Sequence, residues 1–486
     1  MDVALAFMVN HRENVKNMES KLKTDPYPRQ PGRLVLQAGR GDNHRRKVIL
    51  QGILWAAVYL LLCLAPLLIL LVGPLPEGRE LWRELSVALG FGGLAMMALQ
   101  FVLTARFSWL KAPYGSDIVY HFHRQISLVA YTLILAHPLI LFIYSPGYLR
   151  LLNLIEAPWR ARAGVGAVIA LTALIVISVW RKKLKIDYTP WRIWHGLLAT
   201  AAVSLALVHV ALVGHYINTP LKQALWSGYG LFWVGLLVYV RVLKPFWLLL
   251  RPYQVVQVRP ERNKAWTVVV RPKGHAGMRC MPGPFAWLTA WSSPFSEREH
   301  PFSFSSSSEQ SGELSFTIKE LGDFTRRVKE LQPGMQVYLD GPFGAFSVDR
   351  HPHAQGFVFI AGGVGITPIM SMLRSLADRG ETRPLLLIYA NKDWENVIYR
   401  EELEQLSRRL DLEVVHVLEK APEGWQGEVG FVNREILERH LPQSLPRNSH
   451  EIFICGPEPM MNAVEKQLVE MGVWVGDFHS ERFNLV

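Results

Sequence analysis

Apolar residues are concentrated in the first half of the chain, where they form six long stretches separated by short polar connections. Each stretch approaches the roughly 20 apolar residues that a helix needs to cross a lipid bilayer. The pattern predicts an all-α membrane domain of six helices over residues 47–250, preceded by a flexible leader over residues 1–46. The predicted helices cover residues 48–73, 83–105, 118–144, 163–180, 191–213 and 222–249.

The pattern of apolar and polar positions changes after Arg251. Short apolar strands with Gly and Pro turns between them predict a small β-barrel over residues 251–350. From residue 351 to residue 486, strands alternate with helices, which is typical of an α/β doubly wound domain with a parallel sheet. The predicted barrel strands are 253–258, 265–270, 285–288, 313–318 and 336–339.

The basic residues indicate a membrane topology rather than a nucleic-acid partner. The surplus of 52 Lys and Arg over 41 Asp and Glu flanks apolar stretches, as at residues 45–47 and 181–183, and forms no nucleic-acid-binding motif. Basic residues follow the second and fourth helices, so we expect both termini in the cytoplasm, at a bacterial inner membrane. The third connection opposes this orientation with Arg150, Arg160 and Arg162, although two of these arginines can lie inside the fourth helix or cap it.

The chain has three cysteines, Cys63, Cys280 and Cys455, and they are far apart in the sequence. The absence of a paired spacing argues against a disulfide framework and against a cysteine metal site. We therefore expect the soluble half to lie in a reducing compartment.

Four histidines recur at one spacing inside the third and fifth predicted helices. His123 and His137 are fourteen residues apart, and so are His195 and His209. Fourteen residues advance a helix by about 21 Å and return to nearly the same face, so each helix presents two histidines at two depths. Because both helices run outward from the cytoplasm, His123 is expected to meet His195, and His137 to meet His209. Electron-transfer haem takes two axial nitrogens from opposite sides, so the pattern predicts two stacked haems.

Two other roles compete for these histidines. An isolated histidine in a membrane helix more often makes a packing hydrogen bond, and a proton relay would also use buried histidines. The repeated spacing favours haem over the first role, and the second usually needs intramembrane acids. His121 and His215 have no partner at this spacing and are expected at the membrane interface, where His215 could meet an outer substrate. Between residues 91 and 250 the acids, all in predicted loops or helix ends, are Asp117, Glu156 and Asp187.

A glycine-rich turn stands at the head of the doubly wound domain. The apolar strand over residues 357–361 breaks into Gly362, Gly363 and Gly365 and then enters a helix through Thr367 and Pro368. Backbone N–H groups at such a helix start are a natural seat for a pyrophosphate. Taken alone, the turn is also compatible with an ordinary tight connection between a strand and a helix.

The order of motifs in the soluble half is more specific. It reads His300-Pro-Phe-Ser303, Lys319-Glu-Leu-Gly-Asp-Phe-Thr325, Asp340-Gly-Pro-Phe-Gly344, Gly362-Gly-Val-Gly365 and Cys455-Gly-Pro457. This order resembles the ferredoxin-reductase type of flavin and nicotinamide module. Joined to six predicted spans with paired histidines, the region from about residue 48 to residue 486 resembles the ferric reductase and NADPH oxidase superfamily.

The resemblance implies FAD in the barrel. Phe302 is expected to pack on the isoalloxazine, with the Ser303 hydroxyl beside its reactive nitrogen, and His300 takes a place that Arg often holds in soluble relatives. Thr325 is expected to accept the FAD pyrophosphate at a helix start. The remaining expected contacts are Pro301, Gly322 and Lys319, of which Lys319 is equally well explained as a surface residue.

The resemblance also implies NAD(P)H in the C-terminal domain. Cys455 corresponds to a residue that faces the nicotinamide in relatives, although a small buried residue before a Gly-Pro turn is the alternative. Phe483 resembles the terminal aromatic residue that covers the flavin. Polar and basic groups at the end of the strand over residues 385–390 favour the 2′-phosphate of NADPH over NADH. The other expected nucleotide contacts are Asn391, Lys392, Arg400, Gly456 and Pro457.

Together these features predict a transmembrane oxidoreductase that moves electrons from cytosolic NAD(P)H, through FAD and two b-type haems, to a small-molecule acceptor on the outer side, with no obligatory protein partner. Oxygen, giving superoxide, is favoured over a ferric complex because the short outer loops show no ligand set for ferric iron. A different class of function is a haem-binding membrane anchor for a cytosolic flavin reductase. A nucleotide-regulated ion channel would require conductance without haem.

Overall fold

The computed structural model describes residues 34–72, 74, 77–107, 116–296, 298–310, 312–442 and 450–483. Side chains are described from residue 49 onward and, in the helix that begins at Ser116, from residue 119 onward. The chain divides into two compact units, Met1–Trp55 and Ala56–Val486. Residues 1–33 of the expected leader lie outside the described residues.

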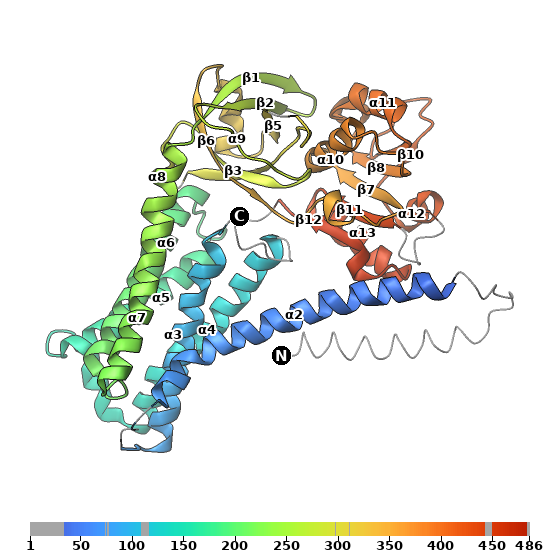
Figure 1. The fold of residues 1–486 in the computed structure, drawn as a ribbon. Helices are drawn as coiled ribbons and strands as arrows, with labels where there is room; N and C mark the ends of the chain where they lie inside the picture. The colour runs from blue at the N-terminus through green and yellow to red at the C-terminus, as the bar shows by residue number, and fades with distance from the viewer. Residues whose placement is uncertain are drawn as a thin grey trace. The chain divides into compact units, whose positions relative to one another are not determined.

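Among the described residues, six helical segments are long and apolar enough to cross a membrane, which confirms the six predicted spans. The sixth segment continues from α7 through a π-helical turn at Tyr239–Leu243 into α8. In Figure 1 the helices are α2 (Leu34–Leu70), α3 (Leu81–Thr104), α4 (Ser116–Tyr144), α5 (Trp159–Val179), α6 (Tyr188–Val213), α7 (Pro220–Val238) and α8 (Lys244–Leu249).

Two helix starts differ by more than three residues from the expected positions. Helix α2 begins at Leu34, so residues 34–46 of the expected flexible leader are helical. No proline lies between Pro31 and Pro66 to interrupt a helix there. Helix α5 begins at residue 159 rather than 163, which places Arg160 and Arg162 in its first turn, as expected for these two arginines.

Small residues allow the membrane helices to approach one another closely. Ala95 on α3, Ala130 on α4 and Ala202 on α6 are buried. A Cβ added at Gly93 on α3 would come within 2.6 Å of the Ile134 side chain on α4. Large apolar side chains remain exposed on the outer faces of the helices, as expected for surfaces that contact lipid.

The first six strands after Arg251 form the predicted antiparallel barrel, in the order β4-β3-β6-β1-β2-β5. A bridge between Phe304 and Phe316 joins the two ends of this order. Strand β4 was not predicted as a strand, because it contains Pro301, which a ladder tolerates only at an edge. The strands are β1 (Tyr253–Glu261), β2 (Ala265–Pro272), β3 (Phe285–Thr289), β4 (Glu299–Ser303), β5 (Leu314–Lys319) and β6 (Gln336–Phe343).

The C-terminal domain is the predicted doubly wound sheet, with parallel strands in the order β10-β9-β8-β7-β11-β12. One apolar core contains residues of α10 and α11, and a second core contains residues of α12 and α13. The elements are β7 (Gly356–Gly362), α10 (Ile366–Asp378), β8 (Leu385–Asn391), α11 (Arg400–Arg409), β9 (Leu412–Leu418), β10 (Glu428–Val429), α12 (Arg434–His440), β11 (His450–Cys455), α13 (Glu458–Glu470) and β12 (Phe478–Glu481).

Candidate functional site: paired histidines and the reductase module

The structure brings the four histidines together in the two pairs that their spacing predicts. The ring centroids of His123 on α4 and His195 on α6 are 6.3 Å apart, and so are those of His137 and His209. Two metal–nitrogen bonds of about 2 Å each, together with the two ring radii, roughly fill such a separation. Each pair is therefore spaced to hold one metal ion between two imidazoles.

The Nδ1 atom of each of these histidines already has a hydrogen-bond partner. In the inner pair, His123 Nδ1 lies 2.9 Å from Gln100 Oε1 and His195 Nδ1 lies 3.1 Å from Ser178 Oγ. In the outer pair, His137 Nδ1 lies 3.0 Å from the Ser86 carbonyl oxygen, and His209 Nδ1 lies 2.7 Å from that of Arg160. An acceptor at Nδ1 fixes the tautomer that leaves Nε2 to bind a metal. The donor set fits two bis-imidazole haems.

Glycines lie directly against the outer histidines. A Cβ added at Gly164 on α5 would come within 2.8 Å of His209 Nδ1, and one added at Gly90 on α3 within 3.3 Å of the His137 ring. Alanine at either position would require the imidazole or one of the helices to shift. These glycines leave the space that the outer pair occupies.

The inner pair opens onto a cavity of about 1620 Å³ that the membrane helices and the reductase module line together. His123 and His195 line it from the bundle, and Lys319, Gly363 and Phe483 line it from the soluble domains. This volume exceeds the roughly 300–1,000 Å³ of a typical small-ligand pocket. The cavity joins the inner histidines to the expected flavin and nicotinamide sites.

Buried ion pairs connect the bundle to the barrel beside this cavity. Glu299 on β4 pairs with both Arg106, after α3, and Arg192 on α6. Asp340 on β6 lies 2.9 Å from Lys244 Nζ on α8 and 3.4 Å from Arg106 Nη1. Burial alone would raise the pKa of Glu299, but the two arginines outweigh it and lower this pKa to about 2. The carboxylate therefore stays ionised, and the network holds strands of the barrel against three membrane helices.

An aromatic side chain also contributes to this contact between bundle and barrel, which we call the joint. The joint consists of Glu299, Asp340, Arg106, Arg192, Lys244 and Trp287. Trp287 on β3 has the guanidinium of Arg106 4.5 Å from its ring centroid and that of Arg192 5.3 Å from it. Such cation–π contacts strengthen when they are removed from water, and Trp287 is buried. The indole therefore packs against the same two arginines that pair with Glu299.

The expected flavin residues lie on β4, next to Glu299. The rings of Phe302 and Phe324 are stacked with their centroids 5.8 Å apart, and His300 lies 4.2 Å from Phe324. Burial, aided by the nearby Arg192 charge, lowers the pKa of His300 to about 4. His300 is thus neutral at neutral pH and offers hydrogen bonds rather than the fixed charge of an arginine. Ser303 is buried at the end of the strand.

In the structure, the Thr325 hydroxyl is hydrogen-bonded within its own turn. Its Oγ1 accepts hydrogen bonds of 2.8 Å from the backbone N–H groups of Leu321 and Gly322. The helix that follows, α9 (Asp323–Arg327), has only five residues. Contact between Thr325 and a pyrophosphate therefore remains a prediction, and the hydroxyl is already occupied by backbone donors. Lys319 lines the cavity, where burial lowers the pKa of its ammonium group.

The glycine turn packs closely against the end of β11. A Cβ at Gly365 would clash with the backbone of Cys455, and one at Gly362 would lie 2.7 Å from the Pro457 ring. Gly363 has a φ of +54°, which favours glycine. Thr367 and Pro368 are buried, and the Thr367 hydroxyl donates to the Val364 carbonyl at 2.8 Å. The turn thus presents backbone to the cavity and keeps these side chains in the core.

The Cys455 side chain lies in the apolar core and is fully buried. Burial, followed by the nearby Glu481 charge, raises the pKa of its thiol well above the ordinary value. The cysteine therefore carries a neutral thiol, and the cavity is lined by the residues that follow it, beginning with Gly456 and Pro457. Phe483 also lines the cavity, as the glycine turn does, and its contact with a flavin stays a prediction.

The residues expected around the 2′-phosphate follow β8. Asn391 is buried, whereas Lys392 is exposed and the Arg400 guanidinium lies 4.7 Å from the Trp394 ring centroid. The acid of this segment, Asp393, caps the next turn, because its Oδ1 accepts from the Asn396 backbone N–H at 3.0 Å. The Asp393 carboxylate is therefore hydrogen-bonded within its own loop.

Sequence reasoning missed the residues that support the site. Gln100, Ser86 and Ser178 come from helices that carry no paired histidine. Glu299 directly precedes the His300 motif, and Arg192 comes three residues before His195, so their positions beside motifs were an available signal. Arg241, in the π-helical turn, also lines the cavity, and such turns often mark functional sites.

Comparison with known families agrees with this architecture. Residues 89–206 match the ferric reductase like transmembrane component, and residues 359–466 match the oxidoreductase NAD-binding domain. The fold and these matches define a chain in which six candidate membrane spans are joined to a reductase module of the kind that uses a flavin and NAD(P)H. The order of these two matches is that of a fusion of the ferric reductase and NADPH oxidase type, which the chain resembles.

Curated relatives match the soluble half. NADH-cytochrome b5 reductase 1 of Lodderomyces elongisporus is 36% identical over 169 residues, which cover 34% of this chain and 55% of that protein. The glycine betaine monooxygenase reductase subunit of Pseudomonas aeruginosa is 35% identical over 156 residues, which cover 32% of this chain and 42% of that protein. The chain thus spans about half the length of the curated relatives it matches.

Solved structures also resemble the chain over about half its length. The ferredoxin reductase in carbazole 1,9a-dioxygenase is 25% identical and covers 48% of this chain and 69% of that chain, with a TM-score of 0.42. A ferredoxin NADP+ reductase from Neisseria gonorrhoeae is 20% identical and covers 48% of this chain and 98% of that chain, with a TM-score of 0.41.

Proposed function

We propose that this protein moves electrons from cytosolic NADPH, through FAD and two b-type haems, to molecular oxygen on the outer side of the membrane. The observation that carries the proposal is the pair of histidine rungs on α4 and α6, each with 6.3 Å between ring centroids. When bound, FAD accepts a hydride and releases electrons singly, which one-electron haem carriers require. The histidines hold the carriers at two depths.

The proposed orientation is supported by which end of the bundle meets the reductase module. Arg106 and Arg192 contact the barrel, and residues 181–183, which are all basic, line the cavity between the bundle and the reductase module. A concentration of Lys and Arg marks the cytoplasmic edge of membrane helices. This edge is also where a cytosolic nicotinamide would enter, so the outer pair, His137 and His209, faces the opposite side of a plasma membrane.

The outer side supports oxygen as the acceptor. Arg83 precedes Ser86, the partner of His137, by about one helical turn. Tyr216 donates a 2.8 Å hydrogen bond to Glu84, and the Arg79 guanidinium lies 5.8 Å from the Tyr216 ring centroid. Guanidinium groups near the outer pair would stabilise the negative charge that forms when neutral oxygen takes an electron.

A ferric complex is the second candidate acceptor, because the matched membrane family is named for ferric reductase. The deciding assay compares two rates in the purified protein: NADPH-driven superoxide formation, measured as dismutase-sensitive cytochrome c reduction, and anaerobic reduction of a ferric chelate. Oxygen as acceptor requires the first rate to dominate and to vanish in the His137→Leu, His209→Leu double variant. Dye reduction without any haem reduction would instead indicate a membrane anchor for a cytosolic reductase.

NADPH is proposed over NADH because Asp393 is engaged in its own turn, while Lys392 and Arg400 supply positive charge near the end of β8. A carboxylate free at the strand end would instead bind the 2′-hydroxyl of NADH. The fungal relatives carry NADH in their names, so both donors belong in the assay. Arg400→Ala should raise the KM for NADPH and leave that for NADH nearly unchanged.

A further inference from the structure

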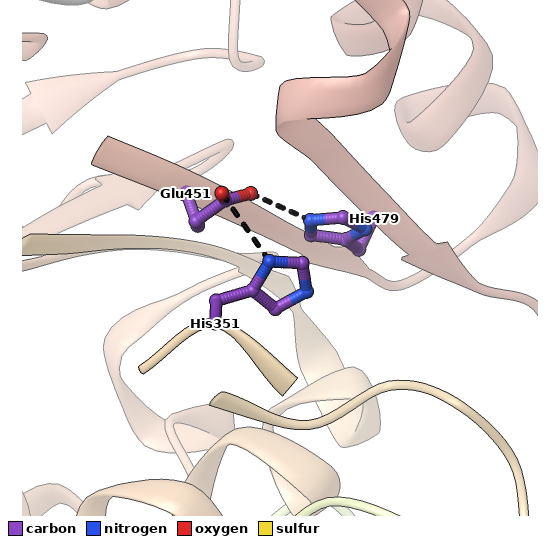
Figure 2. Close-up of side chains that lie close together, drawn as sticks. All are labelled: His351, Glu451 and His479. Carbon is purple, nitrogen blue, oxygen red and sulfur yellow. Dashed lines mark hydrogen bonds and ion pairs between the residues drawn. The ribbon is translucent and has the colours of Figure 1, made fainter. Parts of the chain in front are cut away.

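Two histidines and a glutamate meet at the amino end of the nucleotide-domain sheet, away from the glycine turn at its carboxyl end (Figure 2). His351 follows the short turn Val348–Arg350, Glu451 is the second residue of β11, and His479 is the second residue of β12. Three separate elements thus bring their side chains to one point.

The glutamate lies between the two imidazoles. Its Oε1 is 3.2 Å from His351 Nδ1, and its Oε2 is 2.8 Å from His479 Nε2. One atom from each of the three side chains lies within 4.8 Å of the other two. Figure 2 shows both rings directed at the carboxylate, so the three donors converge without rearrangement of the backbone.

Packing holds the two rings in place. His351 and His479 have their ring centroids 4.2 Å apart, and both lie against the ring of Phe453, at 5.8 Å and 5.1 Å. The side chains of His351, Glu451 and His479 are 11%, 19% and 25% exposed. The cluster is shielded from bulk water and still open to a solvent molecule.

We propose that His351, Glu451 and His479 bind a divalent transition-metal ion of the Zn²⁺ type, with solvent as the fourth ligand. Two imidazoles and one carboxylate with an open position are an established donor set for zinc. Without metal, each ring donates its N–H to the carboxylate. Metal binding requires each imidazole to move that proton to its other ring nitrogen, which keeps both rings neutral.

A metal here would add a further link between strands β11 and β12, which are neighbours in the sheet, and would tie the segment at His351 to both. It would connect the entry to the nucleotide domain, at His351, with β11 and with the edge strand β12. Strand β12 leads directly to Phe483 at the cavity. Bound metal would therefore stabilise the folded domain by mass action and fix the segment that precedes this aromatic residue.

The test measures zinc bound to the purified full-length protein after dialysis against micromolar Zn²⁺. Wild-type protein should retain one zinc per chain more than the Glu451→Gln and His479→Gln variants. His440→Gln is the matched control, because His440 makes a similar 2.7 Å bond to Glu428 without a second histidine, and it should retain wild-type zinc. Zinc should raise the thermal midpoint of wild-type protein and of the control only.

Equal zinc content in wild type, Glu451→Gln and His479→Gln, at equal FAD content, would overturn the proposal and leave a hydrogen-bonded cluster. If Glu451→Gln does not retain FAD, wild type against His351→Gln decides in the same way. The result is independent of electron transfer, since zinc is counted directly and the haem iron is measured separately.

Discussion

The inner and outer histidine pairs have the same ring separation, but their supports differ. Side chains hold the inner pair, through Gln100 and Ser178, whereas each histidine of the outer pair bonds a backbone carbonyl, and the Ser86 hydroxyl is a further partner of His137. The inner pair opens onto the large cavity shared with the reductase module, and the outer pair is packed against glycines. One ligand pattern is thus built into two environments.

The difference predicts that the two pairs respond differently to substitution. Side-chain partners can be replaced one at a time, so the properties of the inner site can be tuned by substitution. Backbone partners cannot be removed by substitution, so the outer site depends on close helix packing instead. The expected effects of mutations that test this contrast range from loss of a whole haem site to a small shift in a haem reduction potential.

The largest effect is expected from removing one pair at a time. The His137→Leu, His209→Leu variant should lose one of two haems, keep NADPH-driven reduction of the other, and lose outer acceptor reduction. The His123→Leu, His195→Leu variant should lose the other haem, and NADPH should then reduce no haem, because the inner site faces the reductase. Pyridine haemochrome content and anaerobic reduction spectra measure both outcomes. Identical spectra for the two variants would refute the assignment of inner and outer roles.

The next largest effect is expected at the joint beside the inner pair. Glu299→Gln leaves Arg106 and Arg192 as buried cations without their shared carboxylate, a type of change that costs about 3–5 kcal/mol. We expect slower haem reduction and unchanged dye reduction by the flavin. Glu313→Gln, which breaks an exposed pair with Arg271, is the control and should change neither rate. Equal haem reduction in both variants would contradict the role of the joint.

The stabilising contribution of Glu299 in the joint should also be lost in acid. The folded-state pKa of Glu299 is about 2, below its ordinary 4.5, so its stabilising contribution is complete above about pH 4.5 and is lost as the pH falls towards 2. Stability of wild-type protein should therefore fall more steeply than that of Glu299→Gln across this window. Thermal unfolding followed by flavin fluorescence would show the difference.

A smaller effect is expected at the glycines of the outer pair. Gly164→Ala would place a methyl group 2.8 Å from His209 Nδ1, so the ring or helix must move, at a cost of about 1–3 kcal/mol. Gly90→Ala, with 3.3 Å to the His137 ring, should perturb the site less, and Gly92→Ala, with open space, should not. Outer-haem content and spectrum should follow this order. The inner site should be unaffected in all three variants.

These glycines also show where sequence reasoning reached its limit. The fourteen-residue spacing, which helical periodicity places on one face, and the common direction of the two helices together predicted which histidines meet. Which glycine lies against His209 depends on how α5 packs on α6, a contact between helices that no single-helix pattern contains. The same reason hid Gln100, which reaches His123 from a neighbouring helix.

In the soluble half, local patterns predicted the sheets and overlooked the joint. Alternating apolar residues gave five of the six barrel strands, and Pro301 concealed β4. The sequence analysis did not single out Glu299, because its burial arises only where the barrel meets the bundle. Cys455 had a correct place at the end of β11, but only the packed structure shows that its thiol lies in the core.

The smallest effect is expected from replacing a single hydrogen-bond partner, and it distinguishes the pairs most directly. Gln100→Leu removes the acceptor at His123 Nδ1, which makes the imidazole a weaker donor to an oxidised metal. The inner-haem reduction potential should therefore become more positive.

The matching variant at the outer pair is Ser86→Ala. It removes a hydroxyl 2.9 Å from His137 Nδ1 but leaves the Ser86 carbonyl at 3.0 Å, so the outer-haem reduction potential should hardly change. Redox titration of both variants measures the contrast, with Thr132→Val as a control on α4 whose hydroxyl bonds only its own helix. A larger shift in Ser86→Ala than in Gln100→Leu would show that backbone support does not protect the outer site.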